Sequence, residues 1–278
     1  MNQNLVIITS ILFLTLFLGL FGCENDRNTD LICKNNPELC ADLHKDSWCR
    51  YEKADLIRHR FALKRTESPT GEQLYQLLEY LETYSACIEL AAGVKHILHP
   101  ERSDDRQRAY AISTQTLQQL RETTKDNPDV YLAYYRWKRF NDNPSQQIVI
   151  EHFRQGLIDE PEMLESIGQH FVREEPQTAQ KVFVSLLKQT EYQSINPDWL
   201  LALATIYRQQ QDFEMSYMLT RANLLISSNT ANEQKMQSMV FGDKNTIAKL
   251  DQQAELLVSV LNDGSFSQSQ FAVSLMPK

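Results

Sequence analysis

A proline followed by an acidic residue recurs from residue 127 onward, and the spacing of this motif strongly restricts the fold. The motif occurs at Asn127-Pro128-Asp129, Glu160-Pro161-Glu162 and Asn196-Pro197-Asp198, so its prolines lie 33 residues (128 to 161) and 36 residues (161 to 197) apart. Proline suits the first turn of a helix because its missing N–H has no partner there, and the acid suits the positive end of the helix dipole. We therefore predict that each motif begins a pair of helices.

Apolar and small residues follow the second and third prolines at helical spacing. These positions are Leu164, Ile167, Gly168, Phe171, Ala179, Phe183 and Leu186 after Pro161, and Leu200, Leu203, Ala204, Tyr207, Phe213, Ser216, Thr220 and Asn223 after Pro197. The spacing resembles the tetratricopeptide repeat, in which a small residue lets the two helices of a pair approach closely. Gly168 and Ala204 stand at this small position. The first repeat departs from the pattern, since Tyr135 and Lys138 replace its small and aromatic residues.

Glycine is scarce, with 8 residues in 278, while Leu, Gln, Glu and Ala abound. This composition favours helices over sharp turns. The predicted fold is all-α, a helical-hairpin array that resembles tetratricopeptide repeats, with disulfide-stapled helices before it and a capping helix after it. We expect N-terminal helices near Ser47–Lys64, Thr70–Pro100 and Arg106–Thr123, and C-terminal helices near Ala231–Met239 and Thr246–Leu261.

The predicted organisation is a succession of short regions. They are residues 1–22 as a signal peptide, 23–46 as a lipidated cysteine and a mostly irregular tether, 47–126 as N-terminal helices with disulfides, 127–229 as the repeats, 230–263 as capping helices and 264–278 as a tail. We expect the tail to pack back on the array through Phe266, Phe271 and Leu275 rather than to bind a ligand.

The N-terminal run from Leu5 to Cys23 is apolar and carries no charge, which is the layout of a secretory signal segment. Its end, from Leu20 to Cys23, resembles the lipobox of bacterial lipoproteins. That resemblance implies that Cys23 becomes the acylated first residue and holds the chain at a bilayer through its lipid. The segment Met1–Asn4 lacks the usual basic residue, and Phe21 is large for a lipobox, so an uncleaved membrane helix remains the alternative.

Four further cysteines, Cys33, Cys40, Cys49 and Cys87, follow Cys23. An even number fits two disulfides in an oxidising compartment, and the sequence leaves all three pairings open. A zinc or redox site is the alternative, although the spacing matches no CxxC ribbon or knuckle.

Known catalytic motifs are absent from the sequence, which contains no GxSxG, HExxH or glycine-rich phosphate loop. We therefore predict that the protein is not an enzyme and needs no cofactor. The net charge of −8 disfavours nucleic acid as a partner. His96 and His99 lie one helical turn apart and form the one candidate metal pair, but cations near a helix C-terminus are favoured by its dipole without any metal.

The tetratricopeptide resemblance implies a partner-binding inner face on the first helix of each pair. Its positions here are Leu132, Arg136, Arg139 and Phe140, then Glu165, Gln169, Val172 and Arg173, then Leu201, Thr205, Arg208 and Gln209. Four of these residues are arginines, whose guanidinium groups bind carboxylates in a bidentate way. We expect Leu132, Arg136, Arg139, Arg173, Leu201, Thr205 and Arg208 to bind an extended acidic peptide. The alternative is an incorrect register, which would scatter the arginines over a solvated face.

These features predict a lipid-anchored protein that faces the periplasm, preferably on the outer membrane because Glu24 rather than Asp follows Cys23. Its expected role is that of an adaptor or assembly factor for an envelope protein or peptide. Binding of peptidoglycan through the aromatic run around Tyr131 and Trp137 is the competing hypothesis. The cysteine-rich start and degenerate repeats also resemble a family of gammaproteobacterial lipoproteins of uncharacterised function, a resemblance that implies no activity.

Overall fold

The computed structural model describes residues 28–277, and within this range every regular element is a helix. The prediction of an all-α chain with disulfides near its N-terminus is therefore confirmed. The chain divides into two compact units, which are residues 1–148 (unit 1) and 149–278 (unit 2). None of the described helices is both long and apolar enough to cross a bilayer. The apolar run that ends at Cys23 lies outside the described residues.

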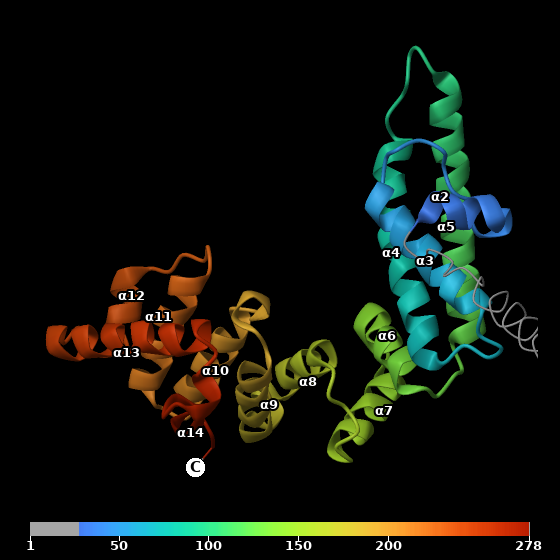
Figure 1. Cartoon of the computed structure of the whole chain (residues 1–278). Coiled ribbons are helices and arrows are strands. Elements are labelled where there is room, and N and C mark those ends of the chain that lie inside the picture. The colour runs from blue at the N-terminus through green and yellow to red at the C-terminus, as the bar shows by residue number, and fades with distance from the viewer. Residues whose placement is uncertain (1–27, 278) are drawn as a thin grey trace, which may run out of the picture. The chain divides into compact units, whose positions relative to one another are not determined.

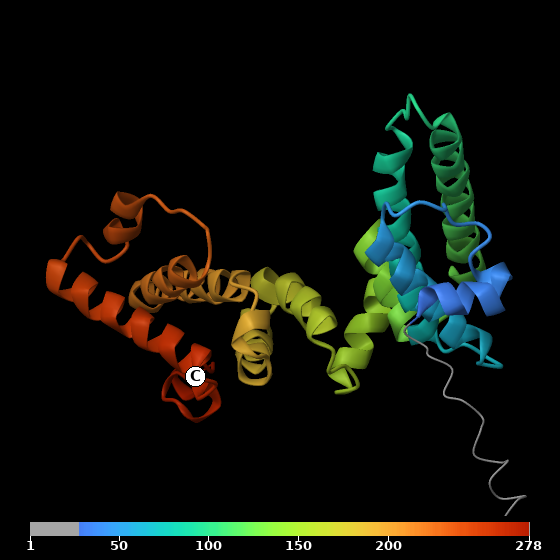
Figure 2. The ribbon, with the colours of Figure 1, turned by 45° about the horizontal axis from the view of Figure 1, so that its top comes forward.

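Unit 1 is built on a long antiparallel pair of helices, α4 and α5, which lie side by side (Figure 1 and Figure 2). Helices α3 and α6 both pack against α4, and α2 packs against α3. The elements are α2 (Thr29–Asn35), η1 (Pro37–Leu39), α3 (Arg50–Lys64), α4 (Gly71–Ala92), α5 (Pro100–Thr124), α6 (Val130–Phe140) and the first half of α7 (Asn143–Arg154). The core of the unit is therefore formed around α4.

The start of α4 follows from a capping box. The hydroxyl of Thr70 accepts a hydrogen bond from the backbone N–H of Gln73 (3.2 Å), and the side chain of Gln73 accepts one from the N–H of Thr70 (3.0 Å). Helix α5 begins at Pro100, earlier than the predicted Arg106. The reason is that Pro100 occupies the first turn, where proline is favoured, while the polar residues before Arg106 show no apolar period.

The prediction of a mostly irregular tether over 23–46 is wrong for its described part. Asn28 caps α2 by accepting a hydrogen bond from the N–H of Leu31 at 3.1 Å, and Ile32 is buried. Leu43 and His44 are also buried. The segment is folded because it supplies apolar side chains that cover α3 and α4.

Unit 2 contains two helical hairpins, α8 with α9 and α10 with α11, and α13 packs against α11. The elements are the second half of α7, α8 (Pro161–Glu174), α9 (Pro176–Gln189), η2 (Tyr192–Ser194), α10 (Asp198–Gln209), α11 (Phe213–Ile226), α12 (Glu233–Ser238), α13 (Lys244–Asn262), η3 (Phe266–Gln268) and α14 (Phe271–Ser274). Helix α8 begins at its predicted proline, and α10 begins one residue after Pro197.

Gly168 shows why a small residue is needed on α8. A Cβ atom at this position would lie 2.9 Å from Cζ of Phe183 on α9. The ring of Phe183 is fully buried and therefore fills the space that the missing side chain leaves. Ala204, at the equivalent position of α10, is also buried.

The C-terminal tail packs back on unit 2, as predicted. Phe266 and Leu275 are buried, and Gln180 on α9 donates a hydrogen bond to the carbonyl of Leu275 at 2.9 Å. The hydroxyl of Tyr207 on α10 donates to the carbonyl of Ser274 at 3.1 Å. Buried polar side chains of the two hairpins thus fix the backbone of the tail.

Candidate functional site

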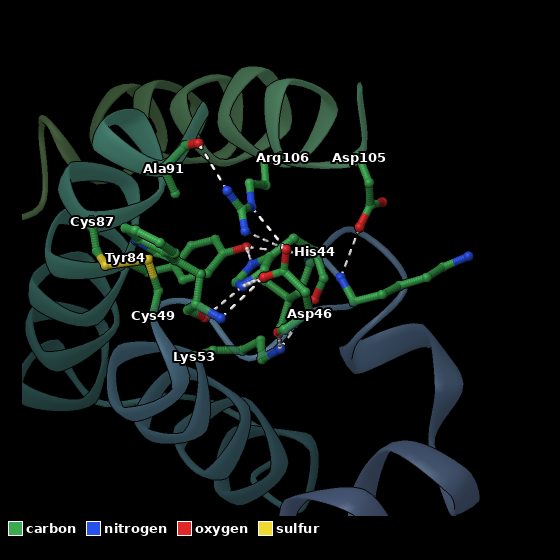
Figure 3. A network of polar contacts seen from close by, with 12 residues as sticks. His44, Asp46, Cys49, Lys53, Tyr84, Cys87, Ala91, Asp105 and Arg106 are labelled. Carbon is green, nitrogen blue, oxygen red and sulfur yellow. Dashed lines mark hydrogen bonds and ion pairs between the residues drawn. A yellow bond between two sulfur atoms is a disulfide. The ribbon is translucent and has the colours of Figure 1, made fainter. Parts of the chain in front are cut away.

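The cysteines of unit 1 form two disulfides, and their pairing is one of the three that the sequence left open. Cys33 pairs with Cys40, and Cys49 pairs with Cys87 on α4, with Cα–Cα distances of 5.7 and 5.9 Å. The second bond joins the start of α3 to α4 (Figure 3). Cys49, Glu52 and Cys87 are close enough to share a metal ion, but two of these three ligands are sulfur atoms bonded to each other.

A buried polar network lies beside the second disulfide, with His44 at its centre (Figure 3). His44 is 2 % exposed, and its Nε2 lies 2.6 Å from the carbonyl oxygen of Trp48. A carbonyl only accepts, so Nε2 carries the proton and Nδ1 accepts from the hydroxyl of Tyr84, 2.9 Å away. Burial and then the ammonium of Lys53 lower the pKa of His44, and burial raises the pKa of Tyr84 to about 12. The neutral ring of His44 therefore links the carbonyl of Trp48 to the hydroxyl of Tyr84 on α4 through two hydrogen bonds.

The charged side chains of this network are all engaged by other groups of unit 1. Arg106 on α5 is 3 % exposed and binds Asp46 through Nε (2.8 Å) and Nη2 (2.6 Å). Its guanidinium also lies over the ring of Trp48, 4.9 Å from the centroid. Lys53 donates to the carbonyl oxygens of His44 and Asp46 at 3.1 and 2.8 Å.

A histidine, a carboxylate and a phenol so close together resemble the parts of an acid–base site. Such catalysis needs the reacting proton within hydrogen-bond reach of the substrate. The ring of His44 is enclosed, and both of its nitrogen atoms are occupied by groups of the protein. We conclude that the network stabilises unit 1. Sequence reasoning missed it because His44 and Tyr84 belong to no motif and meet only after folding.

Three of the predicted partner-binding residues belong to α6 in unit 1. Leu132 is 1 % exposed and lies in the core, out of reach of any partner. Arg136 donates to the hydroxyl of Ser145 (2.8 Å) and to two backbone carbonyl oxygens, and Arg139 pairs with Glu79 (3.0 Å) and Glu82 (2.7 Å). Both guanidinium groups are therefore engaged within unit 1.

The aromatic residues of α6 also pack within unit 1. The ring of Tyr75 on α4 lies 6.0 to 6.4 Å from the rings of Tyr131, Tyr134 and Tyr135. Trp137 meets Tyr134 edge to face at 6.2 Å. This geometry is typical of an aromatic core rather than of a row of rings that is open for stacking.

Three other predicted residues, Leu201, Thr205 and Arg208, come together on α10, in the wall of one cavity of unit 2. The cavity has a volume of about 460 Å³, within the usual range for ligand pockets. Its complete wall consists of Leu201, Ala204, Thr205, Arg208, Ser216, Thr220, Ala231, Asn232, Lys235, Met236, Ser238 and Met239. Arg173 is exposed on α8 and does not contribute to this wall.

The charged residues in the wall of this cavity, which we call the cationic cavity, are all cations. Leu201, Met236 and Met239 supply apolar surface, while Arg208 and Lys235 supply two exposed cations. No acidic residue contributes to the wall. Within residues 28–277, neither the guanidinium of Arg208 nor the ammonium of Lys235 has a hydrogen-bond or ion-pair partner. The cavity therefore suits a group that is both apolar and anionic.

A protein-family model described as "Protein of unknown function (DUF2989)" matches residues 20–221. The chain belongs to this family. The DUF2989 match spans the four cysteines, the buried network and Arg208, and it ends within α11, before Lys235. No curated protein and no solved structure matches the chain.

Proposed function

We propose that this DUF2989 protein is a lipid-anchored envelope protein that binds a segment of a partner protein in the cationic cavity. In this role it is an adaptor or assembly factor and performs no catalysis. The observation that carries the proposal is the meeting of Leu201, Thr205 and Arg208 in one cavity wall, where two unpaired cations face apolar surface.

The charge distribution supports an acidic partner segment. The whole chain carries a net charge of −8, yet the wall of the cationic cavity contains Arg208 and Lys235 and no carboxylate. A general excess of negative charge repels acidic partners, so a local cationic wall favours binding of such a segment at this place alone. The apolar residues of the wall add contact area for a neighbouring aliphatic side chain.

The location outside the cytoplasm is supported by the cysteines. Two disulfides in one small helical unit are typical of chains that fold in an oxidising compartment. The lipobox-like sequence that ends at Cys23 supplies the proposed anchor, with the folded units facing the periplasm and the outer membrane as the preferred site. The tetratricopeptide-like hairpins α8/α9 and α10/α11 are the proposed binding scaffold.

In-cell photo-crosslinking tests the proposed cavity. A photoreactive residue replaces Leu201, Arg208 or Lys235 in the full-length chain, and Lys181 serves as the control because it is exposed on α9 and lies outside the cavity wall. We expect the three cavity positions to capture the same envelope protein, and Arg208→Glu to abolish capture from position 201. Equal capture from position 181, or capture that persists in Arg208→Glu, contradicts the proposal.

The anchor is tested separately by Cys23→Ala. This substitution removes the thiol that the lipid would occupy, so we expect an unacylated precursor that retains residues 1–22. Metabolic labelling with a fatty acid, followed by mass spectrometry of the N-terminus, measures both properties. A variant that is labelled and processed like the natural chain would falsify the lipobox assignment.

A further inference from the structure

A second cavity adjoins the cationic cavity in unit 2. Its volume is about 580 Å³, and Met239 contributes to the walls of both cavities. The complete wall of this second cavity consists of Gln210, Gln211, Asp212, Phe213, Glu214, Met239, Val240, Phe241, Asp243 and Thr246. The two cavities are therefore neighbours, one beside α10 and α12 and the other beside the turn between α10 and α11.

The second cavity has the opposite charge. Asp212, Glu214 and Asp243 contribute to its wall, whereas no Lys, Arg or His does. Asp212 and Asp243 cap α11 and α13 by accepting hydrogen bonds from the N–H groups of Met215 (3.1 Å) and Thr246 (2.8 Å). The hydrogen bonds from Thr246 lower the pKa of Asp243, which keeps this carboxylate ionised. Glu214 is exposed at the start of α11.

Two phenylalanines give the second cavity an aromatic rim. Phe213 is 40 % exposed and Phe241 is 94 % exposed, so both rings are accessible to a ligand in this cavity. Phe241 also has a left-handed backbone with φ of 57°, a conformation that normally selects glycine at the end of a helix. Glycine occupies the next position instead, at Gly242. Burial does not explain why a phenylalanine is held in this conformation, because its side chain is 94 % exposed.

Carboxylates beside open aromatic rings form a site for an organic cation. Glu214 and Asp243 supply carboxylates that can pair with an ammonium or guanidinium group, and phenylalanine rings such as those of Phe213 and Phe241 attract the same charge at their faces. The cationic cavity on the other side of Met239 selects a carboxylate. The charges of the two cavities are thus segregated along one surface, which selects a ligand with both signs of charge.

We infer that the two cavities joined at Met239 form one groove, the bipolar groove, that binds an extended peptide carrying an acidic side chain and a basic one. The acidic side chain enters the cationic cavity, an apolar residue lies over Met239, and a Lys or Arg side chain enters the second cavity. This inference rests on the proposed function and adds the charge pattern of the bound segment. Polyanions such as nucleic acid or an anionic lipid surface are disfavoured, because the second cavity repels them.

Selection from a library of randomised short peptides, displayed and captured on the full-length chain in mild detergent, tests the groove. We expect a consensus with an acidic and a basic residue separated by apolar residues. Arg208→Glu should remove the acidic preference, and Glu214→Lys should remove only the basic one. For a synthetic peptide of the consensus, each reversal should weaken binding about tenfold or more, because it places like charges in contact. The matched controls are Lys181→Glu and Glu255→Lys, at exposed positions outside both walls.

The outcomes separate the two proposals. An acidic and apolar consensus that Glu214→Lys leaves unchanged overturns the bipolar groove and retains the cationic cavity as the binding site. An acidic preference that survives Arg208→Glu, or the absence of any consensus, overturns the proposed function and the groove together. Loss of binding in the two control variants as well shows general electrostatic attraction and overturns the groove.

Discussion

The two units of this chain differ in how the cations on their predicted binding faces are engaged. In unit 1, Arg60, Arg106, Arg121 and Arg139 are all paired with carboxylates of other helices or of the N-terminal segment. In unit 2, the cations Arg208 and Lys235 line an open cavity and have no such partner among the described residues. The cysteines differ as well, because all five lie at or before residue 87.

The number of arginines on a predicted face therefore says little about binding. Arg139 and Arg208 were both expected on the inner face, but the carboxylates of Glu79 and Glu82 on α4 already bind Arg139. A cation contributes to recognition only when the fold leaves it unpaired and near apolar surface. Unit 1 therefore holds both disulfides and pairs its predicted binding arginines internally, and the proposed binding site lies in unit 2.

The largest expected effect is that of Asp46→Ala in unit 1. The substitution leaves the buried guanidinium of Arg106 without its carboxylate, so we expect the free energy of unfolding of unit 1 to fall by about 3–5 kcal/mol. Native-state hydrogen exchange measures this loss for the amides of unit 1 separately from those of unit 2. The control is Asp55→Ala, which breaks the half-exposed pair with Arg58 and should cost at most about 1 kcal/mol. Equal losses in both variants would mean that the buried network does not brace the unit.

Removal of the Cys49–Cys87 bond by a double substitution to serine should destabilise unit 1 by about 2–4 kcal/mol. The reason is that the bond closes a loop with a sequence separation of 38 residues and so restricts the unfolded chain. The Cys33–Cys40 bond has a separation of 7, and its removal should cost less. Denaturant unfolding with and without reductant measures both effects. A larger loss from the short loop contradicts this ranking.

Gly168→Ala tests unit 2, which holds no disulfide. The added Cβ would lie 2.9 Å from the buried ring of Phe183, so we expect a loss of about 1–3 kcal/mol from overpacking. Gly93→Ala is the matched control, because a Cβ there finds only the carbonyl of Leu90 at 3.5 Å. Thermal unfolding monitored by circular dichroism distinguishes the two variants. If Gly168→Ala is as stable as the natural chain, the α8/α9 contact is looser than described.

The smallest expected effect is a pH dependence of unit 1. The pKa of His44 is lowered by burial and then by Lys53, while the carbonyl of Trp48 and the carboxylates of Asp46 and Asp105 oppose this shift. A histidine whose pKa is lowered in the folded state makes its full contribution to the stability of the fold at pH values above its unfolded pKa of about 6.5. This contribution is lost as the pH falls below that value.

We therefore expect the free energy of unfolding of unit 1 to decrease between about pH 7 and pH 5. Denaturant titrations over this range measure the decrease. His44→Gln retains one donor and one acceptor but has no titrating ring, so the decrease should shrink in this variant. His59, whose pKa is also lowered by burial, accounts for part of what remains. An undiminished slope in His44→Gln would show that His44 is not a source of the pH dependence.

Much of the helical architecture follows from local signals in the sequence. Thr70 and Gln73 mark the start of α4 through a capping box, and Pro161 marks the start of α8. Helix α2 was missed, although Asn28 offers a cap, because seven residues are too few to show an apolar period. Local signals thus locate long helices well and short helices poorly.

The candidate site was predictable only in part. The repeat pattern placed Leu201, Thr205 and Arg208 on one face of α10, since residues three to four apart share a helix face. The repeat pattern did not predict that Lys235, Phe241 or Glu214 contribute to the site, because these residues lie outside the first helix of a repeat. Their meeting depends on how α12 and the turn before α13 pack, and such long-range packing leaves no periodic trace in the sequence.

The pairing of Cys49 with Cys87 also has a consequence for the order of oxidative folding. In a reduced, unfolded chain, a Cys40–Cys49 bond closes a loop about as short as the native Cys33–Cys40 bond does, so loop closure alone barely separates a wrong pair from a native one. Packing of α3 on α4 favours the native pairing, because it brings the sulfur atoms of Cys49 and Cys87 together. Oxidation that joins Cys40 to Cys49 before this packing yields a scrambled isomer, and its rescue requires thiol–disulfide exchange.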